Sequence, residues 1–125
     1  MRVRRVYKTR TFARWSRKAG LGDAALRLAI EEMAAGLIEA DLGGRVYKKR
    51  LPLPGRGKRG GARTLVGANL GDRWFFLFGF EKNDRDSIDA RELAALQSIA
   101  RALLELKPRQ LDMAVEAGEL MEIEP

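Results

Sequence analysis

Residues 45–82 read RVYKKRLPLPGRGKRGGARTLVGANLGDRWFFLFGFEK, and this stretch decides the fold. Between Arg45 and Arg63 it carries eight cations and no acidic residue. The most apolar run of the chain, RWFFLFGF at 73–80, comes soon after. A cationic ribbon held against a rigid aromatic strand predicts a site for phosphate groups.

Three strands with short connections are expected within this stretch. In residues 45–53 the even-numbered side chains from Val46 to Pro52 face one way and the odd-numbered side chains the other. The glycine-rich loop 54–61 is expected to be exposed. A strand then covers 62–70, a tight turn follows at Gly71-Asp72, and the run from 73 is apolar on both faces, as in a central strand.

The segments on either side of this stretch predict helices. Residues 11–19 and 23–35 form a helical hairpin, with Thr11 and Asp23 as N-caps. Its second helix buries a stripe that extends to Leu37. Before the hairpin, residues 2–8 alternate like a short strand near a sheet edge. After the central strand, Asp89 and Glu92 form a capping box that begins a long helix ending near residue 106.

The predicted fold class is α+β. It is a small twisted, mostly antiparallel sheet, made of the N-terminal strand and a three-strand meander, with an N-terminal helical hairpin and a C-terminal helix. Helices cover one face of the sheet, and the other face stays partly open. Residues 1–106 form the main domain, and 107–125 form an acidic C-terminal extension with a short helix that begins at Pro108. This extension either folds back over the basic body or stays solvated, which is the commoner outcome.

The composition of the chain limits which partners and which catalytic groups it can use. The 125 residues carry a net charge of +7, which favours polyanions or an acidic protein as partners. The chain has no cysteine and no histidine, which excludes disulfides, thiol nucleophiles, histidine bases and histidine metal ligands. No apolar run approaches the length of a membrane span, and no secretory signal is present, so we expect a cytoplasmic protein without membrane contact.

The candidate site residues come from the cationic ribbon and from the end of the aromatic strand. Candidates for catalysis are Arg63, Lys82, Lys48, Lys49 and Glu81. Candidates for binding RNA phosphates or bases are Arg45, Arg50, Arg56, Lys58, Arg59, Arg85 and Tyr47. No metal and no cofactor are expected. The alternative interpretation is that these cations form an ordinary solvated face, and that Tyr47 is a packed aromatic.

Without histidine, RNA cleavage would depend mainly on electrostatics. The 2′-hydroxyl of RNA can attack its own neighbouring phosphate, so that no protein nucleophile is needed. An arginine such as Arg63 would stabilise the charge that develops on the phosphoryl oxygens, an effect worth about 3–4 kcal/mol per well-placed donor. A lysine among other cations can transfer a proton. Glu81 could act as a base, although pairing with a neighbouring cation is an equal alternative.

Two motifs in this region resemble a known family. The loop GRGKRGGART (55–64) and the segment FLFGFEKNDRDSI (76–88) are similar to RelE/HigB-type toxins of bacterial type II toxin–antitoxin modules. The likeness is closest to the branch with the patterns GxGKxGGxRT and FxxGFxKxxRxNI, and it covers about residues 1–106. Ser87 stands where asparagine is usual.

The resemblance implies a small ribosome-dependent mRNA endonuclease. It implies a cognate antitoxin that binds and neutralises the chain, forming a hetero-oligomer. By position, the arginine of the GGxR motif is Arg63, and the basic group that ends the last strand of the meander is Lys82. Well-studied members carry a catalytic tyrosine or histidine after that strand, whereas residues 83–125 contain neither.

Two other functions remain open at this point. The first is a non-catalytic module whose basic face binds nucleic acid or an acidic antitoxin segment, with affinity that falls steeply as salt rises. The second is a toxin of the related ParE branch, which poisons DNA gyrase. The basic GGAR loop argues mildly against a gyrase poison.

Overall fold

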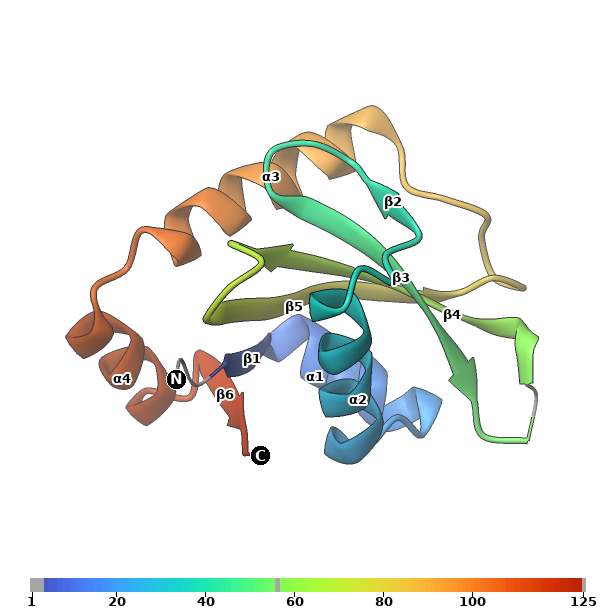
Figure 1. The fold of residues 1–125 in the computed structure, drawn as a ribbon, viewed down its shortest axis with the longest axis horizontal. Helices are drawn as coiled ribbons and strands as arrows, with labels where there is room; N and C mark the ends of the chain where they lie inside the picture. The colour runs from blue at the N-terminus through green and yellow to red at the C-terminus, as the bar shows by residue number, and fades with distance from the viewer. Residues whose placement is uncertain (1–3, 56, 125) are drawn as a thin grey trace.

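The computed structural model describes residues 4–55 and 57–124, leaving aside the side chains of residues 57–60. Helices and strands follow in the order β1 (Arg5–Thr9), α1 (Arg10–Ala19), α2 (Asp23–Ala34), β2 (Ala40–Asp41), β3 (Val46–Leu53), β4 (Gly57–Ala68), β5 (Arg73–Glu81), α3 (Ala90–Leu104), α4 (Pro108–Glu116) and β6 (Leu120–Ile123). In this part of the chain six strands form one sheet, in the order β2-β3-β4-β5-β1-β6 (Figure 1). The predicted α+β class and the meander β3-β4-β5 are confirmed.

The N-terminal strand lies near an edge of the sheet, as expected, but it is not itself the edge strand. β1 lies between β5, to which it is parallel, and β6, to which it is antiparallel. Val6 and Tyr7 point to opposite faces of the sheet, and both are fully buried. A strand with a neighbour on each side has its backbone groups satisfied on both edges, so β1 is an interior strand.

Helices pack on both faces of the sheet. On the hairpin face, α1 and α2 cover a core that includes Leu51, Val66 and Phe76. On the α3 face, α3 and α4 cover a second core that includes Leu65 and Phe75. The two helical layers lie on opposite sides of the strands (Figure 1). The expectation of one partly open face is therefore wrong for most of the sheet, because the C-terminal helices supply the second cover.

One glycine sets how closely the hairpin approaches the sheet. Gly79 on β5 lies directly beneath the Trp15 ring, and a Cβ at this position would come within 2.3 Å of that ring. Phe12, next to Trp15, stacks on Phe76 with ring centroids 4.9 Å apart. Phe12 is thus part of the core on the hairpin face, and Trp15 packs against it.

The capping residues predicted from the sequence place the starts of the helices to within two residues of those observed. The Asp89–Glu92 capping box is present as predicted. The first helix begins earlier than expected, because the hydroxyl of Thr9, and not that of Thr11, accepts a hydrogen bond from the amide of Phe12. At α2 the cap residue is Gly22, and Asp23 is the first helical residue.

Two expectations about the segments around the meander are wrong. Leu37, assigned to the buried stripe of the second helix, is 60% exposed, because α2 ends at Ala34 and the chain turns at Gly36. The exposed loop expected over 54–61 is shorter, because β4 already begins at Gly57. The glycines of this segment therefore belong largely to an extended strand.

The C-terminal segment is built into the sheet. β6 pairs with β1, Leu111 of α4 is fully buried, and Leu120 and Ile123 are almost fully buried. The predicted short helix is confirmed as α4. The segment is therefore not a solvated tail: its apolar residues complete both cores at the edge of the sheet opposite to β2.

Candidate functional site

Three of the candidate cations share the α3 face. Lys48 and Arg50 lie on β3, and Arg63 lies directly opposite Arg50 on β4. Residues paired across an antiparallel ladder project to the same side of the sheet, so the two arginine side chains are neighbours. On the next strand Phe80 is paired with Arg63. The sheet register thus brings together an arginine pair, a lysine and an aromatic ring.

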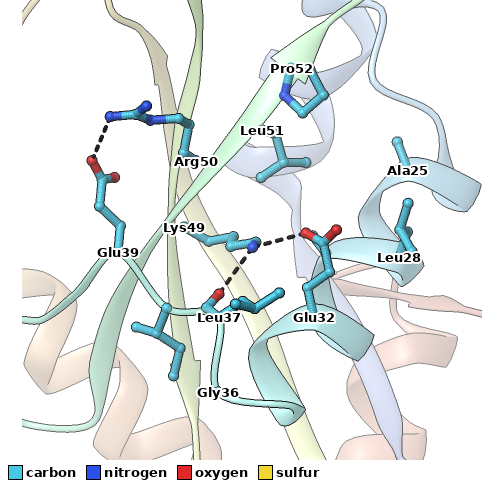
Figure 2. A pocket seen from close by; sticks show the side chains of 12 residues that line it. Ala25, Leu28, Glu32, Gly36, Leu37, Glu39, Lys49, Arg50, Leu51 and Pro52 are labelled. Carbon is cyan, nitrogen blue, oxygen red and sulfur yellow. Dashed lines mark hydrogen bonds and ion pairs between the residues drawn. The ribbon is translucent and has the colours of Figure 1, made fainter. Parts of the chain in front are cut away.

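Arg63 is buried and held by an acidic residue that the sequence did not single out. Its side chain is 6% exposed, and its Nε lies 3.2 Å from Oε2 of Glu39. The other carboxylate oxygen of Glu39 lies 3.5 Å from Nη2 of Arg50 (Figure 2). One carboxylate therefore bridges two guanidinium groups, an arrangement that offsets the cost of burying Arg63.

Lys49 and Tyr47 lie on the hairpin face, away from Arg63. The Lys49 ammonium, on a side chain that is 10% exposed, is 2.9 Å from a carboxylate oxygen of Glu32 and donates to the carbonyl oxygen of Leu37 at 3.0 Å (Figure 2). Tyr47 packs against the core of this face, and burial raises the pKa of its hydroxyl. Both side chains have structural roles here, and the sheet separates them from the arginine pair.

The Lys49 side chain forms part of a groove between α2 and the free edge of β3. The groove has a volume of about 610 Å³. Its walls include the exposed Leu28 and Leu37, and Pro52 lies along its strand side. Proline cannot donate a backbone hydrogen bond, which protects this edge against pairing with another strand.

The end of β5 carries the next group of candidates. Glu81 is paired with Ala62, which places it on the hairpin face, opposite to Arg63. Lys82 is exposed, and its amide donates to the carbonyl oxygen of Gly61. This bond extends the β4–β5 ladder by one residue beyond Glu81, so Lys82 continues the alternation of the strand.

Arg85 reaches back over the aromatic residues of β5. Its guanidinium forms a two-pronged ion pair with Glu92, at 3.0 and 2.5 Å, and lies over the rings of Phe78 and Phe80. The hydrogen bonds to Glu92 raise the pKa of Arg85, and the same bonds lower the pKa of Glu92. Arg85 is therefore already engaged, by the residue that also caps α3.

The remaining candidates fall outside this cluster. Arg45 lies in the turn directly before β3, with φ of +67°, and lines a separate cavity with Gln97 and Arg101 of α3. Arg56 and the side chains of Lys58 and Arg59 lie outside the described residues.

The sequence does not indicate that Glu39 pairs with Arg63, and it indicates Glu92 only as a helix-capping residue. Glu39 stands in the connection between α2 and β2, where no periodic pattern marks it. The one available signal was that β3 carries three consecutive cations, which a folded chain must balance with acidic residues nearby.

Within residues 4–55 and 57–124, no three acidic, histidine or cysteine side chains are grouped so that they could hold a metal ion. None of the helices in the same ranges has the length and apolar character of a membrane span.

Comparison with known protein families gives a match over nearly the whole chain. The family model described as the RelE toxin of the RelE / RelB toxin–antitoxin system matches residues 4–123, nearly the whole chain and including α4 and β6. No curated protein matches the chain.

Proposed function

Because the chain belongs to the RelE toxin family of toxin–antitoxin systems, we propose that it is a ribosome-dependent, metal-independent mRNA endonuclease that inhibits translation. Membership of the family also gives the chain a cognate antitoxin as partner. The observation that carries the proposal is the cluster of Lys48, Arg50 and Arg63 on one face beside Phe80. Two guanidinium groups and an ammonium group are suited to binding successive phosphates.

The proposed reaction needs no protein nucleophile. The 2′-hydroxyl oxygen of RNA attacks the adjacent phosphorus, and the bond from phosphorus to the 5′ oxygen breaks, leaving a 2′,3′-cyclic phosphate and a 5′-hydroxyl. Arg63 stabilises the negative charge on the phosphoryl oxygens, an effect worth about 3–4 kcal/mol. Lys48 and Lys82 are the proposed groups for moving the proton from the 2′ oxygen to the leaving 5′ oxygen. Lys49 and Glu81 are left out because they lie on the other face.

A cell-free translation assay tests the proposal. The purified chain should stop translation and leave message cut within the ribosome-bound region, as mapped by primer extension. Arg63→Ala should reduce the cleavage rate by about 100- to 1,000-fold, and Lys49→Ala, in a protein that still folds, should cleave normally. Intact message with full translation would refute the endonuclease.

A second candidate function is a non-catalytic module that binds nucleic acid or an acidic antitoxin segment. The burial of Arg63 favours it, because a side chain that is 6% exposed has little direct access to substrate. It predicts RNA binding that weakens steeply with salt, without any cleavage product. A DNA supercoiling assay on the same protein tests the gyrase-poison alternative.

A further inference from the structure

Glu39 occupies the place where an anionic ligand of the two arginines would bind. Its oxygens lie 3.2 Å from Nε of Arg63 and 3.5 Å from Nη2 of Arg50. Carboxylates and phosphates use the same guanidinium donors, so the two groups compete for one position. We propose that Glu39 is an internal competitor for phosphate, a latch that holds Arg63 and Arg50 until a phosphodiester of RNA displaces it. The choice of RNA as the displacing ligand rests on the function proposed above.

The contacts of Glu39 with the two arginines are longer than those of another arginine–glutamate pair in the same protein. Arg85 and Glu92 form two parallel hydrogen bonds at 3.0 and 2.5 Å. Glu39 instead splits its two oxygens between two arginines, and its contact with Arg50 is at the limit of a hydrogen bond. The guanidinium of Arg63 is further supported by the carbonyl oxygen of Ala62, also at 3.5 Å. A ligand that offers Arg63 shorter and better-aligned contacts can therefore replace the carboxylate.

The position of Glu39 in the chain allows it to move. It precedes β2, a strand of two residues at the edge of the sheet, and its amide donates to the carbonyl oxygen of Lys48. The side chain is 27% exposed, so the carboxylate can turn towards water without crossing the core. Backbone pairing keeps the residue in place while the side chain leaves.

The charges balance before and after the exchange. The cluster of Arg50, Arg63 and Glu39 has a net charge of +1, and Lys48 on the same face adds a further cation. A phosphodiester carries one negative charge, as the carboxylate does. Exchanging one for the other therefore leaves the buried guanidinium of Arg63 neutralised, whereas simple loss of Glu39 would not.

The test compares Glu39→Gln with a matched control at the far edge of the sheet. Glu122→Gln makes the same change of charge in a carboxylate of similar exposure (24%) that also pairs with an arginine Nε. Binding of an RNA with 2′-O-methyl groups, which cannot be cleaved, is measured by fluorescence anisotropy. Glu39→Gln should bind about five- to ten-fold more tightly than the wild type, and Glu122→Gln should stay within two-fold. Unchanged or weaker binding by Glu39→Gln would mean that Glu39 only neutralises Arg63.

A second readout does not depend on RNA. Phenylglyoxal labels accessible arginines, and peptide mass spectrometry reports the rate at Arg63. The rate should rise in Glu39→Gln and, by a smaller factor, in Glu39→Asp, which keeps the charge but shortens the side chain. An unchanged rate in both variants overturns the latch. A raised rate in a protein that binds no RNA supports the latch and refutes only the proposed RNA substrate.

Discussion

Two arginine–glutamate pairs lie at opposite edges of the sheet, and they are built in opposite ways. Near β2, one carboxylate, that of Glu39, is shared by Arg50 and Arg63. Near β6, one guanidinium, that of Arg5, is shared by Glu122 and Asp112. The first group has a surplus of positive charge and the second a surplus of negative charge.

Because of this difference, the edge near β2 can accept an anionic ligand, whereas the ion pairs at the edge near β6 stabilise the fold. The hydrogen bonds that Arg5 donates to Glu122 raise the pKa of Arg5, and the guanidinium also pairs with Asp112. The same side chain covers the ring of Tyr7. An anionic ligand gains nothing at that edge, whereas the surplus cation near Glu39 can hold one.

The largest expected effect is on the β6 edge. Ile123→Ala removes a side chain that is buried in the hairpin-face core, which should lower the free energy of unfolding by about 2–5 kcal/mol in urea titrations. Met121→Ala, on the same strand but partly exposed, should cost less. RNA affinity of folded Ile123→Ala should equal that of the wild type. A loss of affinity would show that this edge takes part in binding.

A pair of adjacent lysines on β3 sharpens the contrast between the two faces. Lys49→Ala removes one hydrogen bond and one ion pair of an almost buried ammonium and should lower the free energy of unfolding by about 1–3 kcal/mol, with RNA affinity unchanged. Lys48→Ala should instead leave the free energy of unfolding nearly unchanged and weaken RNA binding. Its RNA affinity should fall several-fold, and the slope of log affinity against log salt should become shallower by about one. Equal effects of the two substitutions on RNA binding would contradict the assignment of faces.

The smallest effect concerns Tyr7, in the interior strand beside β6. Burial raises the pKa of this hydroxyl from 10 to about 12, and among the described residues the hydroxyl oxygen has no hydrogen-bond partner. Above pH 10 the unfolded chain loses this proton while the folded chain keeps it, so stability should fall as pH rises from 10 to 12. Tyr7→Phe should reduce that slope and leave stability at pH 7 unchanged or slightly higher. Thermal melts across this range, with Tyr47→Phe as comparison, give the measurement.

Features set by neighbouring residues could be predicted from the sequence. The Asp89–Glu92 capping box needs only four residues, and the alternation along β3 correctly separated Lys48 and Arg50 from Lys49. The apolar run of β5 is central because both of its faces are covered. These signals lie within a few residues of the element that they describe.

Features that depend on distant partners could not be predicted. The parallel pairing of Val6 with Trp74, and the addition of β6 next to β1, join residues far apart in the sequence. Leu120–Ile123 is too short for its pattern to indicate a strand. The same holds at the site: the burial of Arg63 depends on Glu39, which only the path of the chain between α2 and β2 brings to it.

The interior position of β1 also determines when the molecule can finish folding. β1 is made well before its two neighbours, because β5 begins at Arg73 and β6 at Leu120. A nascent chain can therefore pair one edge of β1 once β5 has been made, and the other edge only once residue 123 has been made; such long-range pairing is slow to form. We expect Val6 and Tyr7 to gain their full cover only in a late stage of folding, when β6 pairs with β1.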